Sequence, residues 1–344
     1  MLKAGPTRLI LRLACFLPLP IVLLLPYWIG TRPAVQQRLT RNFDGITNAL
    51  ISGKPVWVKG DLRPVKSAYM MRMPAAEEIL IVGGSRAIRI SADWFQPRSA
   101  YNAAFFDAGP EDIISTIQLS LENGKLPREI IYELNPTLAR LGNQNAAGPL
   151  EAYFCHALVR YGLLPTREIL HDLYSWQQLD WAVRPWRAPA WSVSTEIKDS
   201  TLVYPDGTAT YTSESSDPAP EAVRASVVKM LRHPETSYLQ RRTQPRPSEF
   251  DLKMFGRFLD DLQRRGIQVV VLLLPLNPIA YDFYTERGGY DEAWIRREMQ
   301  TRRIQIVGSY SPTLTHATEA DFVDDVHARP ALVRRLLREA GIIQ

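Results

Sequence analysis

The chain has 344 residues, of which 46% are hydrophobic, so it is long enough to bury one large core or two smaller ones. Its formal net charge is +5, but residues 1–30 carry +3 and residues 31–75 carry +6, which leaves −4 on the rest. A nucleic-acid-binding module concentrates basic charge on its folded part, so this distribution argues against a nucleic-acid partner. Only two cysteines occur, which excludes a disulfide framework and a thiolate metal cluster.

The N-terminal segment at residues 13–29 carries no charge and follows three basic residues. This pattern fits a signal peptide or an uncleaved transmembrane anchor. The run ends with the aromatic pair Tyr27-Trp28 in place of the small residues that a signal cleavage site needs. We therefore expect residues 1–30 to form a cytoplasmic tail and a transmembrane anchor. Basic residues flank the run almost equally, so charge alone does not set its orientation.

Residues 31–75 are expected to form a basic stem, because they contain eight lysines and arginines against two aspartates. Such a stem would lie near anionic lipid headgroups or form a solvated linker. Residues 76–344 are expected to form the main domain.

In that domain, apolar strand patterns alternate with amphipathic helix patterns. The sequence predicts strands at 79–82, 128–134 and 268–274 and helices at 110–123, 248–265 and 330–341. This alternation predicts an α/β fold with three layers, in which a mostly parallel, flavodoxin-like sheet is covered by helices on both faces.

Residues 165–247 do not follow this alternation. They contain four tryptophans at five-residue intervals, a period that matches neither a helix nor a strand, and then a Ser/Thr/Pro/Glu-rich segment. We expect an insertion beside the carboxyl edge of the sheet, where α/β folds place their ligand clefts. Trp181 and Trp186 are predicted to stack on sugar rings as a lip of the cleft; the alternative is that they belong to the core of the insertion.

The first candidate for chemistry is Ser85, which follows the predicted strand 79–82 directly after Gly83 and Gly84. Two glycines allow a tight turn that exposes a serine hydroxyl, as a nucleophile requires. A phosphate-binding or purely structural turn is the alternative, although the chain has no dinucleotide-binding or Walker pattern there.

The second candidate is the segment 324–327, in which Asp324 precedes His327 by three residues and can reach its ring. A serine needs a base that takes its proton, and a histidine base works best when a carboxylate fixes its tautomer. Asp321 and Asp325 compete with Asp324 for that orienting role. The remaining histidines show no metal-ligand spacing, so we expect neither a metal nor a cofactor.

Together, the Gly83-Gly84-Ser85-Arg86 block and the Asp-x-x-His block resemble the SGNH (GDSL-like) hydrolase superfamily. The Gly-Ser-Arg form is similar to its membrane-anchored branch, which includes the D-alanyl-lipoteichoic acid biosynthesis protein and alginate-type O-acetyltransferase families. The resemblance covers about residues 76–344. The family's third block falls on residues 133–136, where only the asparagine matches.

This resemblance implies a catalytic Ser85, His327 and Asp324, with Asp324 selected by the family spacing. It also implies an oxyanion site formed by the Ser85 N–H and Asn135, with Asn102 as a further donor. The alternative for both asparagines is a structural turn cap. Arg86 is expected to pair with a carboxylate or phosphate of the substrate, and the alternative is a surface ion pair.

The resemblance implies a single-pass protein of the bacterial inner membrane whose domain lies in the periplasm or outside the cell. It would move an acyl group to or from a cell-envelope or exported polysaccharide through an acyl-serine intermediate. A multi-span membrane acyl donor protein is implied as a partner by resemblance alone. The alternatives are a non-catalytic scaffold of a polysaccharide assembly or secretion complex and a secreted esterase or lipase.

Overall fold

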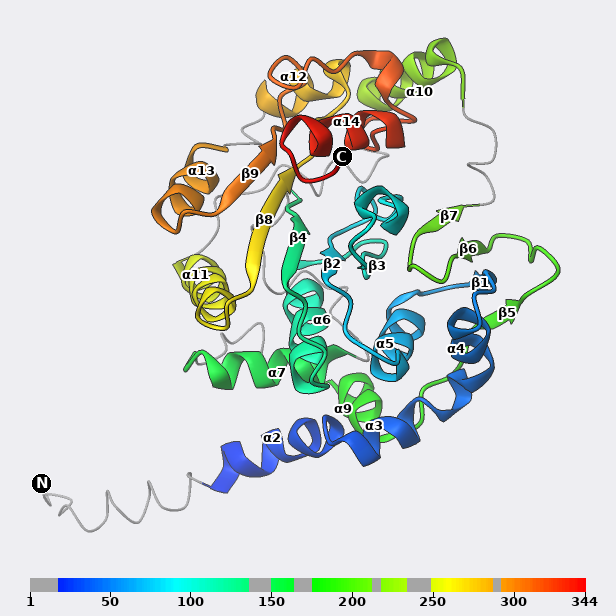
Figure 1. Cartoon of the computed structure of the whole chain (residues 1–344), viewed down its shortest axis with the longest axis vertical. Coiled ribbons are helices and arrows are strands. Elements are labelled where there is room, and N and C mark those ends of the chain that lie inside the picture. Colours follow the sequence, from blue (N-terminus) through cyan, green and yellow to red (C-terminus); the bar gives the residue numbers. More distant parts are fainter. Residues whose placement is uncertain (1–17, 136–149, 164–174, 212–217, 234–248, 287–291) are drawn as a thin grey trace, which may run out of the picture.

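A computed structural model describes residues 18–135, 150–163, 175–211, 218–233, 249–286 and 292–344 (Figure 1). The elements in chain order are α2 (Pro18–Gly30), α3 (Pro33–Leu39), η1 (Arg41–Phe43), α4 (Asp44–Ile51), β1 (Val56–Lys59), α5 (Arg63–Arg72), β2 (Ile79–Val82), η2 (Ala92–Phe95), β3 (Ala100–Asn102), α6 (Pro110–Glu122), β4 (Glu129–Glu133), α7 (Glu151–Arg160), α9 (Trp176–Val183), β5 (Ala190–Ser192), β6 (Thr201–Val203), β7 (Ala209–Tyr211), α10 (Pro220–Arg232), α11 (Glu249–Arg264), β8 (Gln268–Leu273), α12 (Pro278–Glu286), α13 (Glu292–Thr301), β9 (Gln305–Gly308), η7 (Glu319–Asp321) and α14 (Pro330–Glu339).

The centre of the molecule is a five-stranded sheet in the order β3-β2-β4-β8-β9, in which every neighbouring pair is parallel (Figure 1). The predicted α/β fold with a parallel sheet is therefore confirmed. The three predicted strands and three predicted helices correspond to β2, β4, β8, α6, α11 and α14, with small differences at their ends. Strands β2 and β4 are buried along their whole length, which is expected when both faces of a parallel sheet are covered.

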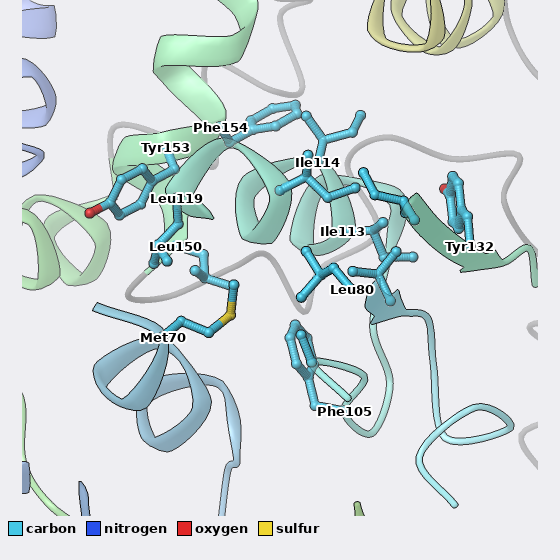
Figure 2. Packing of buried hydrophobic residues seen from close by; sticks show 14 of the residues in the cluster. Met70, Leu80, Phe105, Ile113, Ile114, Leu119, Tyr132, Leu150, Tyr153 and Phe154 are labelled. Carbon is cyan, nitrogen blue, oxygen red and sulfur yellow. The ribbon is translucent and has the colours of Figure 1, made fainter. Parts of the chain in front are cut away.

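Alternate residues of β2 face two separate apolar cores. Leu80 belongs to the larger core, in which it lies near Ile113 of α6, and Tyr132 of β4 joins the same core (Figure 2). Ile81 points to the opposite core, where Leu336 of α14 packs. The period of two along a strand thus places helices on both faces of the sheet.

A second, smaller sheet is antiparallel and has the order β5-β1-β6-β7. Strand β1 lies between two strands that follow it by more than 130 residues, with Trp57 opposite both Ser192 and Leu202. The expected stem and the expected insertion therefore share one structural unit.

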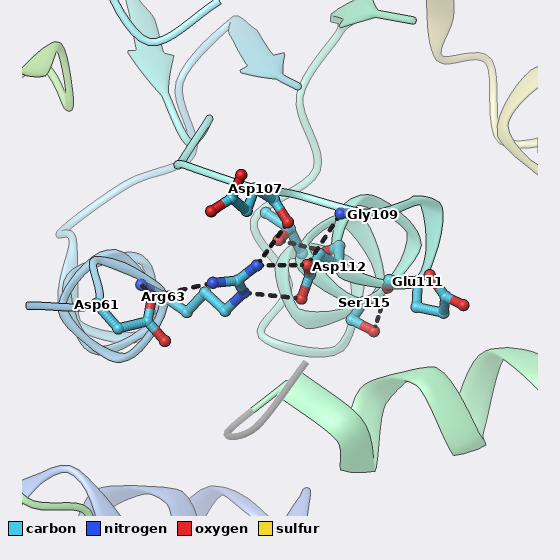
Figure 3. A network of polar contacts seen from close by, with 8 residues as sticks. Asp61, Arg63, Asp107, Gly109, Glu111, Asp112 and Ser115 are labelled. Carbon is cyan, nitrogen blue, oxygen red and sulfur yellow. Dashed lines mark hydrogen bonds and ion pairs between the residues drawn. The ribbon is translucent and has the colours of Figure 1, made fainter. Parts of the chain in front are cut away.

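Residues 31–75, the expected basic stem, are folded onto the domain. They form α3, α4, β1 and α5, and Phe43, Val56 and Val65 are fully buried in the larger core. Part of the basic charge is used internally: Arg63 of α5 forms hydrogen bonds to Asp112 of α6 at 2.9 and 3.1 Å (Figure 3). Apolar residues between the charges are enough to fold this segment onto the domain.

Helix α2 covers residues 18–30 of the predicted transmembrane anchor, and residues 13–17 lie outside the described part of the chain. Within the part that is described, no helix has both the length and the apolar character needed to cross a membrane. Helix α2 packs against α7 and α9, and its Tyr27 is fully buried.

Lys66 leads to a prediction about stability. Its ammonium is buried and donates hydrogen bonds to the carbonyl oxygens of Asn102, at 3.0 Å, and Ala104. Burial lowers the pKa of Lys66 to about 7, and the charge of Asp206 only partly offsets this. An unfolded lysine has a pKa of about 10.4, so the unfolded chain binds more protons than the folded chain between pH ~7 and ~10. The contribution of Lys66 to the free energy of unfolding should therefore rise with pH across this window.

We expect Lys66→Met to remove that contribution. Denaturant titrations at pH 7, 8, 9 and 10 should show the wild type gaining stability relative to the variant as the pH increases. Parallel pH profiles for the two proteins would contradict the prediction.

Candidate active site

Ser85 lies just beyond the carboxyl end of β2. The preceding Gly83 is needed because β4 approaches closely: a Cβ on Gly83 would lie 2.6 Å from the Cβ of Glu133. The chain then turns tightly, with the Ala87 N–H donating to the Gly84 carbonyl at 3.1 Å. The two glycines thus allow the backbone to turn at the sheet edge and leave the Ser85 side chain partly exposed.

His327 lies in a short loop that leads into α14. The loop is closed by a bridge between Phe322 and Ala328 and by a hydrogen bond from the Val323 N–H to the His327 carbonyl at 3.0 Å. Within it, Oδ1 of Asp324 accepts hydrogen bonds from the N–H groups of Val326 (2.8 Å) and His327 (2.7 Å). One carboxylate oxygen therefore shapes the loop and leaves the other available for the imidazole.

Ser85, His327 and Asp324 form one hydrogen-bonded chain. Nε2 of His327 lies 2.7 Å from Oγ of Ser85, and Nδ1 lies 2.6 Å from Oδ2 of Asp324. Because a carboxylate accepts only, the Nδ1–H donates to Asp324, which leaves Nε2 as the acceptor for the serine hydroxyl. The fold thus brings together two sequence segments that are 242 residues apart.

The structure also distinguishes the three competing aspartates. Burial alone would raise the pKa of Asp324, but hydrogen bonds and charge from His327, together with the Val326 N–H, lower it to about 2. Asp324 therefore remains ionised at neutral pH. Asp325 is buried and accepts a hydrogen bond from the Tyr284 hydroxyl at 2.9 Å, while Asp321 accepts from the Thr318 N–H at 2.8 Å.

The two asparagines predicted as oxyanion donors have different surroundings. Asn102 is fully buried, and its Nδ2 donates to the carbonyl oxygens of Ala87 and Ile90, both at 2.8 Å. Both donor hydrogens of its amide are therefore used inside the fold, which corrects the expected role as a donor to substrate. Asn135 is partly exposed, and its Nδ2 lies 3.8 Å from the position that a Cβ on Gly84 would occupy. This amide lies against the turn that carries Ser85.

Arg86 lines the same small cavity as Ser85 and His327, and its hydrogen bonds go to the interior of the fold. Its side chain is buried, with Nε donating to the Val326 carbonyl at 3.1 Å and Nη2 donating to the Pro275 carbonyl at 2.7 Å. The predicted pairing of Arg86 with a substrate carboxylate or phosphate stays a prediction.

Glu133 is a site residue that the sequence did not single out. It is fully buried at the end of β4, and its Oε2 accepts a hydrogen bond from the Gly84 N–H at 3.0 Å. Burial raises the pKa of Glu133, while Arg86, the Gly84 N–H and the charge of His327 act in the opposite direction. The sequence feature that could have indicated Glu133 is the position of an acidic residue directly after the apolar run 130–132.

The space beside the serine is small. A cavity of about 10 Å³ lies next to Ser85 and His327, and its other lining residues include Arg86, Ile88, Arg89 and Phe106. This volume is about that of one water-sized probe. A larger cavity of about 440 Å³ lies at the opposite, amino edge of the sheet, beside Gln268 and Gln305, and is remote from the hydrogen-bonded triad.

The two tryptophans predicted to form a lip lie elsewhere. Trp186 is only 1% exposed, contacts Phe43 edge-on at 6.3 Å between ring centroids, and donates from Nε1 to the Trp181 carbonyl at 3.1 Å. Trp181 is partly buried and packs against the larger core. Helix α9, which carries Trp181, packs against α2 and lies at the end of the molecule opposite α12 and α14 (Figure 1). Trp186 lines a small space there together with Trp181 and Gly30 of α2. Trp186 therefore has no free face for a sugar, and the predicted lip is corrected to a core contact.

No protein-family model matches the sequence, and a search of curated proteins also finds no match.

Proposed function

We propose that this protein is an SGNH-like serine esterase or O-acyltransferase. The observation that carries the proposal is the hydrogen-bonded chain from Ser85 through His327 to Asp324, with distances of 2.7 and 2.6 Å, beyond the carboxyl ends of a parallel sheet. Ligand sites in open α/β folds occur at this edge. An ionised Asp324 on Nδ1 and a serine hydroxyl on Nε2 are the arrangement that activates a serine nucleophile.

In the proposed mechanism, Oγ of Ser85 attacks the acyl carbonyl carbon while His327 accepts the hydroxyl proton. The resulting oxyanion is stabilised by the Ser85 N–H and the Asn135 amide. His327 then gives the proton to the leaving alcohol oxygen, which leaves an acyl-Ser85. In the second half, water or an acceptor hydroxyl attacks the acyl group, with His327 again acting as base and then as acid. Esterase and transferase differ only in that acceptor.

The cell-envelope or exported polysaccharide, the periplasmic location and the multi-span acyl donor partner come from the resemblance to the membrane-anchored branch. We include them in the proposal with residues 13–29 as the membrane segment.

Membrane fractions from cells that make the full chain should retain it after carbonate extraction, and release of a shortened soluble form would support the secreted esterase.

Labelling with a fluorophosphonate tests the catalytic proposal directly. This reagent forms a covalent phosphonate on an activated serine, so the wild type should be labelled at Ser85 and Ser85→Ala should not be labelled. Ser309→Ala is a suitable control because Ser309 is buried and donates its hydroxyl to Glu292, and not to a histidine base that would activate it. It should be labelled like the wild type.

A second candidate is a non-catalytic scaffold of a polysaccharide assembly or secretion complex. The observation that favours it is the altered third block, in which only Asn135 matches the family pattern. A scaffold has no need for a reactive serine. Absence of fluorophosphonate labelling in a folded wild-type protein would favour the scaffold over the enzyme.

A further inference from the structure

The side chain of Arg86 connects the turn of the nucleophile to the loop of the base. Its backbone directly follows Ser85, and its Nε donates to the carbonyl of Val326, the residue that precedes His327. Its Nη2 also donates to the carbonyl oxygens of Leu274 and Pro275, just beyond β8. One guanidinium therefore links three segments that meet at the triad.

Glu133 acts on the same turn from the opposite side. Its Oε2 accepts the Gly84 N–H at 3.0 Å, and its Oε1 lies 3.8 Å from Nη1 of Arg86. Both side chains are almost completely buried, at 0% and 3% exposure. The pair thus holds the residues immediately before and after Ser85.

We infer that Glu133 and Arg86 form a buried positioning pair that sets the placement and the electrostatic environment of Ser85 relative to His327. The catalytic meaning of this inference rests on the proposed function. Neither residue touches the reacting atoms in this role: Glu133 acts through Gly84, and Arg86 acts through Val326.

Stability alone is a poor explanation for this pair. Removing two charges from water is unfavourable, and buried ion pairs contribute to stability only when their hydrogen bonding is complete. Here Oε1 of Glu133 and Nη1 of Arg86 have no hydrogen-bond partner within the described residues, and their separation of 3.8 Å is long. The contacts that are well formed are those to Gly84 and Val326, the neighbours of the proposed nucleophile and base.

Glu133 also lies close enough to the imidazole to interact with it. Burial raises the pKa of Glu133, and the charge of His327 is one of the influences that lower it.

Glu133→Gln tests this, because glutamine keeps the shape and an oxygen acceptor for the Gly84 N–H but loses the charge. We expect kcat for p-nitrophenyl acetate to fall by about 10- to 100-fold with little change in KM. The reason is that a small displacement of Ser85 from His327 slows the reaction but leaves substrate binding intact. A purely structural role would lower Tm without this split between kcat and KM.

Arg86→Lys provides a second variant that keeps the charge balance but loses the planar set of donors to the three carbonyl oxygens. It should lower kcat with little change in KM, and it keeps the inference testable if Glu133→Gln does not fold. Asp112→Asn is the matched control: it neutralises the buried partner of Arg63, between α5 and α6, where the two side chains are 2.9 Å apart. It should lower Tm but leave kcat unchanged.

A wild-type kcat in Glu133→Gln would overturn the inference. So would an equal loss of kcat in Asp112→Asn, because it would show a general effect of removing a buried charge. The proposed function fails differently: a folded wild type without ester turnover or fluorophosphonate labelling refutes the enzyme, whereas the inference fails when the wild type is active and Glu133→Gln is equally active.

Discussion

Ser85→Ala and His327→Ala should each lower kcat for a small ester such as p-nitrophenyl acetate by at least about 10³-fold, because a serine without its base is a poor nucleophile. The 2.7 Å contact between their side chains means that they act in the same step. The double variant should therefore be little worse than either single variant. Steady-state kinetics on purified proteins with the same Tm would measure this.

The alternative outcome has a clear meaning. If the two losses multiplied in the double variant, Ser85 and His327 would contribute independently and would not form one site. Asp324→Asn should cost as much as or less than either single change, because it disturbs the tautomer and orientation of His327 but leaves the nucleophile and base in place.

Asn135→Ala should lower kcat by about 10²- to 10³-fold, the usual loss when one oxyanion donor is removed. Its effect on Tm should be small, because Asn135 is partly exposed at the end of β4. KM should change little, since the donor matters most when negative charge develops on the substrate oxygen.

Asn102→Ala is the matched comparison and should show the opposite pattern. It removes two buried hydrogen bonds to the carbonyl oxygens of Ala87 and Ile90 and leaves the Ala104 N–H without the acceptor that Asn102 supplies. An unsatisfied buried group costs about 1–3 kcal/mol, so this variant should have a clearly lower free energy of unfolding. A large Tm loss in Asn135→Ala with kcat unchanged would reverse the two assignments.

Local patterns were sufficient for much of the fold. The apolar run before Gly83 predicted β2, and the continuous apolar segment after Gly266 predicted β8, because strands buried on both faces need no polar side. Pro330 and Gly341 correctly bracketed α14, because proline favours the first helical position and glycine the position after the end. The spacing of Asp324 and His327 also predicted their contact, because residues three apart in a tight loop are neighbours.

The pairing of distant segments could not be predicted in the same way. Strand β1 completes its sheet with β5 and β6, and nothing in residues 56–59 specifies partners more than 130 residues away. For this reason residues 31–75 looked like a basic stem. The tryptophan spacing was likewise uninformative, because Trp186 is buried by Phe43, which comes from that same N-terminal segment.

The sequence by itself therefore determined the α/β class, the strand that ends at the glycine turn and the close pairing of an aspartate with a histidine. Only the tertiary structure decided that Ser85 contacts His327. It also decided that Arg86 and Asn102 donate hydrogen bonds to interior carbonyl oxygens and that Glu133 accepts the N–H of the serine turn. The physical reason is that local sequence sets whether a polar side chain stands at a buried strand end. Which donors and acceptors it meets there depends on the segments that the fold brings to that end.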